Sequence, residues 1–199
     1  MPAGSPKRVL CQGCGRPQRV CLCQALVAVH ADIELIIWQD PTEAKHKLST
    51  APLLHKSLPN SQLLVGEQFS YEQIFAATEP AHCALLYPLE AGQPVSVASR
   101  HKVTKLLLLD GTWKKVRRLL HLNPWLRELP FVRLAPQSVS RYAIRKSPRE
   151  DGLSTIEAGV AALSWLDTGQ DYSVILGVLE RLVELQQQHT PENQRYRRS

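Results

Sequence analysis

Four cysteines lie close together near the start of the chain, at Cys11, Cys14, Cys21 and Cys23. Thiolates are preferred ligands of structural zinc, and four of them complete a tetrahedral site with no open position for catalysis. The glycines around the first pair allow the tight turn that Cys-x2-Cys needs. We therefore predict a structural zinc ion, with redox-active thiols or unmetallated cysteines as the alternatives. The remaining cysteine, Cys83, lies in an apolar run and is expected to fill the core.

A second candidate site lies at Asp110, which ends a run of four leucines. An apolar run of this length is typical of a parallel strand that is buried on both faces. Gly111 permits a sharp turn, and Thr112 is expected to cap the helix that follows. Open α/β sheets bind their ligands at the carboxyl ends of strands, so the position of Asp110 indicates a site.

The helix after Asp110 is predicted to be basic on one face. Trp113, Val116, Leu119 and Leu120 recur at helical spacing and form the apolar face. The net charge of the chain is +6 and its pI is about 9.2, which favours an anionic partner, with nucleic acid first. A solvated basic face is the alternative. The opposite face carries Lys114, Lys115, Arg117 and Arg118.

A third pattern, Ser154-x-x-Glu157, opens a predicted helix. The pair forms a capping box, in which the serine and the glutamate satisfy each other's backbone N–H groups. This local role explains both residues but not Thr155 between them. A helix N-terminus also binds anions, so a ligand carboxylate or phosphate is the functional alternative.

The elements that must position these residues alternate along the chain. Helices are expected after Pro41, at 70–78, from Trp113 onward, and at about 154–167 and 171–188. Strands are expected at 33–39, 61–67, 83–88, 106–109 and 130–136. This alternation predicts an α/β fold with a mostly parallel sheet.

Two domains are expected: a small four-cysteine zinc-binding module at 1–30 and a catalytic domain at 31–199 with a short basic tail. The polar segment at 137–152 is longer than most loops and is therefore expected to be functional or ordered by a ligand.

Several function classes lack support in the sequence. No G-x-G-x-x-G or P-loop pattern follows a strand, which argues against Rossmann and P-loop nucleotide binding. No apolar run is long enough to span a membrane, and the N-terminus lacks the apolar core of a signal peptide. We therefore expect a cytoplasmic protein with no membrane partner.

Taken together, these motifs resemble the DTW-domain proteins, a family of tRNA-uridine aminocarboxypropyltransferases. The resemblance rests on the cysteine pattern, on Asp-Gly-Thr-Trp at 110–113 and on Ser-Thr-Ile-Glu-Ala at 154–158. A looser match is Pro41-x-Glu43 followed by Thr50. The family pattern has a histidine and an asparagine where this chain has Asp40 and Ser49, so the roles of those two residues stay open.

The resemblance implies transfer of the 3-amino-3-carboxypropyl group of S-adenosylmethionine (SAM) to N3 of a uridine in tRNA, with release of methylthioadenosine. It also implies a fold like that of the knotted SPOUT methyltransferases, which bind SAM without a Rossmann fingerprint. Two other functions are alternatives: a non-catalytic zinc-containing RNA-binding protein and a SPOUT-like RNA methyltransferase.

The resemblance also implies roles for individual residues. Asp110 and Trp113 are the expected catalytic residues. SAM contacts are expected from Leu109, Asp110, Thr112, Trp113, Arg145, Ser154, Thr155 and Glu157. tRNA contacts are expected from Lys114, Lys115, Arg117, Arg118, Arg141 and Lys146.

Three of these residues have alternative roles. Asp110 is either the base that deprotonates N3 or the anchor of a positive group of SAM. Trp113 either stacks on a base or fills the core. Arg145 pairs either with the SAM carboxylate or with an RNA phosphate.

Overall fold

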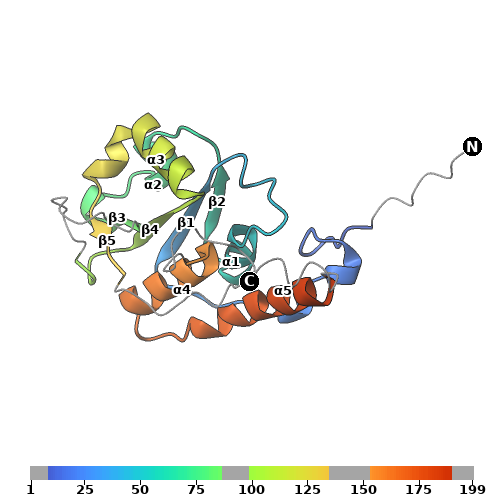
Figure 1. Ribbon diagram of the computed structural model, residues 1–199. Helices are drawn as coiled ribbons and strands as arrows, with labels where there is room; N and C mark the ends of the chain where they lie inside the picture. The colour runs from blue at the N-terminus through green and yellow to red at the C-terminus, as the bar shows by residue number, and fades with distance from the viewer. Residues whose placement is uncertain (1–8, 87–98, 135–152, 190–199) are drawn as a thin grey trace, which may run out of the picture.

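A sheet of five parallel strands forms the centre of the protein (Figure 1). The computed structural model describes residues 9–86, 99–134 and 153–189. The strand order is β2-β1-β4-β3-β5, and every neighbouring pair is parallel. The strands are β1 Glu34–Gln39, β2 Gln62–Val65, β3 Cys83–Leu86, β4 Lys105–Asp110 and β5 Phe131–Val132. The predicted α/β class with a mostly parallel sheet is confirmed.

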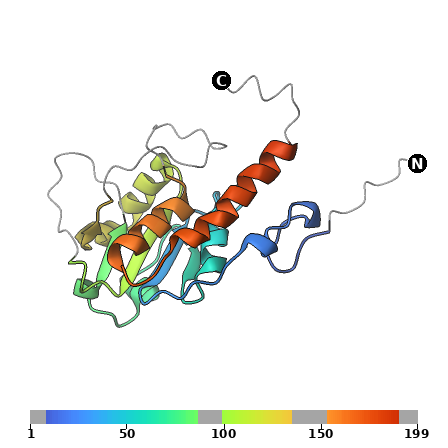
Figure 2. The same cartoon turned by 90° about the horizontal axis from the view of Figure 1, so that it is seen from below.

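Helices cover both faces of the sheet (Figures 1 and 2). The α-helices are α1 Ala51–Ser57, α2 Tyr71–Phe75, α3 Trp113–Leu122, α4 Thr155–Leu166 and α5 Leu176–His189. Helices α1, α4 and α5 bury their apolar side chains in one core cluster, and α2 and α3 bury theirs in a second. Short 3-10 helices lie at Gln18–Val20, Cys23–Ala25, Pro80–His82, Pro124–Glu128 and Ser173–Ile175.

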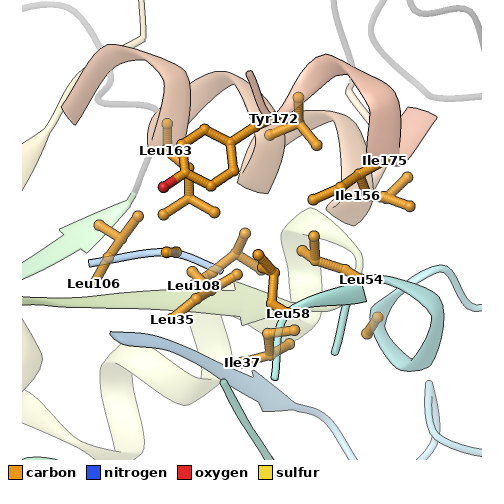
Figure 3. Close-up of a cluster of buried hydrophobic side chains, with 14 of the residues drawn as sticks. Leu35, Ile37, Leu54, Leu58, Leu106, Leu108, Ile156, Leu163, Tyr172 and Ile175 are labelled. Atoms are coloured by element: carbon orange, nitrogen blue, oxygen red, sulfur yellow. The ribbon is translucent and has the colours of Figure 1, made fainter. Parts of the chain in front are cut away.

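Alternation along the central strands decides which side chains reach which face. Leu35 and Ile37 of β1 and Leu106 and Leu108 of β4 point toward α4 and α5 (Figure 3). Leu107 points into the core on the other face. By the same period of two, the side chains that end β1 and β4 lie on the side of the sheet that α1 and α4 cover.

The carboxyl ends of β1 and β4 form a topological switch point. These two strands are neighbours, but the chain leaves β1 toward α1 on one face and leaves β4 toward α3 on the other. A crevice between oppositely directed connections is where open parallel sheets bind ligands. The fold therefore places the end of β4 at a favoured ligand position.

Some element boundaries differ from the prediction. The last helix, α5, begins at Leu176, because the residues before it form a turn in which buried Tyr172 donates a 2.6 Å hydrogen bond to Asp167. Strand β5 is only two residues long. Cys83 is fully buried in β3, as predicted. The knot that the resemblance implies stays a prediction.

Candidate active site at the switch point

Asp110 lies buried at the end of β4, and both of its carboxylate oxygens accept hydrogen bonds. Its Oδ2 accepts from Nε2 of Gln39 at 2.6 Å, and its Oδ1 accepts from the hydroxyl of Thr155. These two bonds fix the orientation of the Asp110 side chain at the switch point. The predicted position of Asp110 at the carboxyl end of a buried parallel strand is confirmed.

Gln39 is the residue that links the parts of this site, and no sequence pattern pointed to it. It lies opposite Asp110 in the register of β1 and β4 and is 1% exposed. Its Nε2 donates to Asp110 and also, at 2.8 Å, to the hydroxyl of Ser49. Ser49 therefore ties the segment between β1 and α1 to the site.

The N-terminus of α4 completes the carboxyl edge. Ser154 and Glu157 form the predicted capping box, with the backbone N–H of Ser154 donating to Glu157 at 2.8 Å. This leaves Thr155 free of the box, and its hydroxyl reaches Asp110 instead. The backbone N–H of Ile156 donates to the hydroxyl of Thr50 at 3.4 Å. The two motifs from 110–113 and 154–158 thus meet in one site.

Two buried acids, Asp40 and Glu43, lie in the turn after β1. Oδ1 of Asp40 accepts from the backbone N–H of Thr42 at 2.8 Å and from its hydroxyl at 2.5 Å. Nζ of Lys115 lies 3.0 Å from Glu43 and 4.0 Å from Asp40. Burial alone would raise the pKa of Asp40, but the hydrogen bonds from Thr42 and the charge of Lys115 lower it below its ordinary value. Lys115 is therefore a structural partner of this turn.

The other cations of α3 face outward. Lys114 and Arg117 are exposed, and within the described residues neither forms an ion pair. Arg118 pairs with the carboxylate of Glu67 through two hydrogen bonds of 2.7 and 2.8 Å. The amphipathic pattern of the helix is confirmed, because its apolar residues at 116, 119 and 120 are buried.

Other predicted SAM contacts lie on the far side of the strand end. Leu109 and Trp113 are half-buried and pack against the core beneath α2 and α3. Thr112 is the N-cap residue of α3, as predicted, but its side chain makes no capping hydrogen bond. Arg141, Arg145 and Lys146 lie outside the described residues.

The four N-terminal cysteines form a compact cluster. All four Sγ atoms lie within 4.8 Å of one another, and three of the pairs are 3.5, 3.5 and 3.7 Å apart. These separations exceed the S–S bond length of about 2.05 Å. Tetrahedral zinc with Zn–S bonds of about 2.3 Å separates its ligands by about 3.8 Å. The cluster therefore has the donors and the spacing to hold a metal ion.

Local backbone geometry supports the same interpretation. A hydrogen bond from the backbone N–H of Cys14 is the main cause that lowers the pKa of Cys11 to about 6, whereas hydrogen bonds with Cys11 and Cys21 raise the pKa of Cys23 to about 12. A Cβ atom on Gly13 would lie 2.7 Å from Sγ of Cys23, so the tight turn requires glycine there. The segment is anchored to the rest of the protein by Leu22, which is buried in the core cluster that includes residues of α5.

Within the ranges 9–86, 99–134 and 153–189, no helix is both long and apolar enough to cross a membrane.

Comparisons with known proteins point to one family. Residues 8–187 match the model of the DTW domain. The chain is 32% identical over 194 residues to tRNA-uridine aminocarboxypropyltransferase 2 of Macaca fascicularis, covering 92% of this chain and 65% of the relative. It is 30% identical over 171 residues to the Drosophila melanogaster protein of that name, covering 81% and 68%.

A plant protein is similar as well. The chain is 27% identical over 218 residues to tRNA-uridine aminocarboxypropyltransferase A of Arabidopsis thaliana, covering 92% of this chain and 83% of the relative. The chain thus spans only about 65% of the length of the macaque relative. No solved structure matches the chain significantly.

Proposed function

Because this chain belongs to the DTW-domain family, we propose that it transfers the 3-amino-3-carboxypropyl group of SAM to N3 of a uridine in tRNA. Animal and plant relatives carry the name of this activity. The observation that best supports the proposal is the hydrogen bond from Thr155 to Asp110, which joins the two most specific motifs of the chain at the switch point.

The proposed reaction is a substitution at carbon. Uridine N3 loses its proton to solvent water and attacks the methylene carbon that links the aminocarboxypropyl chain to the sulfonium. The carbon–sulfur bond breaks, its electron pair stays on sulfur, and neutral methylthioadenosine leaves. Since the sulfonium is already an activated leaving group, the protein contributes mainly by aligning N3 with this methylene rather than with the methyl group.

We propose that the Asp110 carboxylate binds a positively charged group of SAM, either its ammonium or its sulfonium. The two carboxylate oxygens of Asp110 accept hydrogen bonds from Gln39 and Thr155, which hold the group in one orientation at the switch point. An ionised carboxylate attracts the ammonium or the sulfonium of the cosubstrate. The alternative role of Asp110 is deprotonation of N3.

The residues around Asp110 hold it in place. Gln39 and Thr155 fix the carboxylate, and Ser49 fixes Gln39 in turn. The capping box of Ser154 and Glu157 fixes the start of α4, and with it Thr155. SAM contacts from these α4 residues, from Leu109, Thr112 and Trp113, and from Arg145 remain proposals that follow from the family.

We further propose that Cys11, Cys14, Cys21 and Cys23 bind one structural zinc ion. Their Sγ separations support four-thiolate coordination, which leaves no position for a substrate. The ion would fix the fold of residues 9–25 and would supply no step of the transfer. Reduced thiolates of this kind fit a reaction that takes place in the cytoplasm.

The exposed face of α3 is the proposed tRNA contact. Lys114 and Arg117 are available there, Arg118 is exposed although paired, and Arg141 and Lys146 are the further candidates. The family fold also leads us to propose a SPOUT-like knot, which the parallel sheet and the return of α4 to the carboxyl edge support. An experimental structure that traces 135–152 would test the knot.

One assay separates the proposed function from its rivals. The protein is incubated with SAM and bulk tRNA, and the adenosine-containing products are resolved by chromatography. Methylthioadenosine that forms only when tRNA is present supports the transfer. S-adenosylhomocysteine would instead indicate a methyltransferase, and unchanged SAM would indicate an RNA-binding protein without this activity.

A further inference from the structure

The segment that carries the cysteines contains no acidic residue. From the first residue to Ala31 the chain has the cations Lys7, Arg8, Arg16 and Arg19, and the first acid is Asp32. Arg19 is exposed and Arg16 is half-buried. Most protein surfaces intersperse charges of both signs, so a surface of one sign indicates a partner of the opposite charge.

The turn between β1 and α1 presents a second set of exposed cations. Lys45, His46 and Lys47 are exposed in succession. The two acids of this turn, Asp40 and Glu43, are buried and lie next to Lys115, so neither faces the same solvent. The outward side of the turn is therefore basic as well.

A hydrogen bond joins these two basic segments. Nη2 of Arg16 donates to the backbone oxygen of Lys47 at 3.2 Å. The two segments thus form one surface, which we define by Arg16, Arg19, Lys45 and Lys47 and call the module–turn surface. It adjoins the candidate active site, because two residues after Lys47 the same turn provides Ser49, the partner of Gln39.

This surface is separate from the basic face of α3. The turn contacts the cysteine segment through Lys47 and contacts α3 through Glu43 and Lys115. It therefore lies between the two. A polyanion that binds both α3 and the cysteine segment would therefore also contact the turn beside the switch point.

We propose that the module–turn surface binds phosphate groups of the same RNA that presents its uridine to the active site. This inference rests on the proposed function. An anionic membrane would also attract the four cations, but an RNA explains why they adjoin the site: one substrate can contact this surface, the active site and α3 together. Lys and Arg contacts with phosphates position an RNA without reading its sequence.

The cysteine cluster gives this surface its shape. Arg16 and Arg19 lie between Cys14 and Cys21, so the cluster fixes both ends of the segment that carries them. A surface held in this way presents its cations with little loss of conformational entropy on binding. The proposed metal site therefore also determines the shape of the proposed RNA-binding surface.

The test uses two charge-removing variants of the full chain, Arg16→Gln/Arg19→Gln and Lys45→Gln/Lys47→Gln. We measure the affinity for bulk tRNA over a salt series, with SAM binding and zinc content measured alongside. The slope of log affinity against log salt is negative, and each lost phosphate contact reduces its magnitude by about 0.7 to 0.9. We expect each double variant to reduce the magnitude of the slope by about 1 to 2 and to weaken tRNA binding by about tenfold near physiological salt.

The matched control is Lys102→Gln. Lys102 is an exposed cation just before β4, at the opposite edge of the sheet from the site. This variant should leave the slope unchanged, and no variant should change SAM affinity or zinc content.

Salt slopes equal to the wild type in both double variants would overturn the inference. So would variants that lose binding to anionic phosphatidylserine vesicles while tRNA binding stays intact. These binding results are independent of the transfer assay: wild-type protein that makes methylthioadenosine while the variants bind tRNA normally contradicts the surface alone. Wild-type protein that binds tRNA without making methylthioadenosine contradicts the proposed function alone.

Discussion

Gln39 and Asp110 face each other across the two central strands, and the Gln39 amide donates a 2.6 Å hydrogen bond to the Asp110 carboxylate. The same amide nitrogen also donates a 2.8 Å hydrogen bond to the hydroxyl of Ser49. A single buried side chain therefore connects β1, β4 and the turn that leads to α1. This connection fixes the orientation of the Asp110 carboxylate, which we propose binds a positively charged group of SAM.

Gln39→Met keeps the length of the side chain and removes its donors. Leaving a buried partner unsatisfied typically lowers the free energy of unfolding by about 1–3 kcal/mol. We expect that loss in denaturant unfolding, together with weaker SAM binding measured by calorimetry. The matched control is Gln62→Met, which removes an amide–carboxylate bond to Glu34 at the opposite end of β1. Normal SAM affinity in a folded Gln39→Met protein would contradict the role of Gln39.

Asp110→Asn keeps the size of the side chain and removes its charge. If Asp110 anchors the cation, SAM affinity should fall, and raising the pH should not restore the rate. If Asp110 is instead the base, SAM binding should survive while transfer falls by about 10²–10⁴. High pH would then recover part of the rate, because N3 would ionise without help. Calorimetry and a pH–rate profile of the variant distinguish the two results, and near-normal activity would defeat both roles.

Lys115→Met and Lys114→Met separate structure from RNA binding on one helix. Lys115 pairs with two buried acids, so its loss should lower the free energy of unfolding by about 1–3 kcal/mol. We expect the smaller end of the range, because Lys115 is about a third exposed. Lys114→Met should leave stability unchanged. It should reduce the magnitude of the slope of log tRNA affinity against log salt by about 0.7 to 0.9. The reverse pattern would contradict this assignment.

The stability difference at Lys115 should also depend on pH. The folded-state pKa of Asp40 is depressed, so Asp40 contributes stability above its unfolded pKa of about 3.9. That contribution is lost as the pH falls through the folded value. The difference between wild type and Lys115→Met, measured by unfolding in denaturant, should therefore shrink below about pH 4. A difference that grows with acid would contradict the pairing.

Much of the site could be predicted from local patterns. The four leucines before Asp110 identified a buried strand and its carboxyl end, and Ser154-x-x-Glu157 identified a helix start. Gln39 could not be predicted in this way, because a glutamine that ends an apolar run carries no local signal. Its importance depends on pairing with a residue 71 positions away in sequence. Such a pairing follows only from the register of β1 and β4.

Lys115 illustrates the same limit from the other direction. Helical spacing correctly placed it away from the apolar face of α3, together with Lys114. Which of those cations reaches back to Glu43 depends on how the turn after β1 packs against the helix, over 72 residues of sequence separation. Periodicity assigns a face to a residue, but tertiary packing assigns its partner.

Gly13→Ala tests the metal site without removing a ligand. The added Cβ would lie 2.7 Å from Sγ of Cys23, so the turn must distort and zinc binding should weaken. Elemental analysis of protein purified without chelator should find about one zinc per chain in the wild type and clearly less in the variant. The control, Gly177→Ala, adds a methyl group where nothing lies within 4 Å and should retain full zinc. A wild-type protein without zinc would contradict the proposal.

The proposed function requires that the aminocarboxypropyl chain, and not the methyl group, moves from SAM to the RNA. The most direct measurement uses SAM with a carbon label in the aminocarboxypropyl chain and tritium in the methyl group, followed by digestion of the tRNA to nucleosides. We predict that a modified uridine keeps the carbon label, while the tritium is recovered in methylthioadenosine. Tritium in the RNA, or RNA without either label, would contradict the proposed transfer.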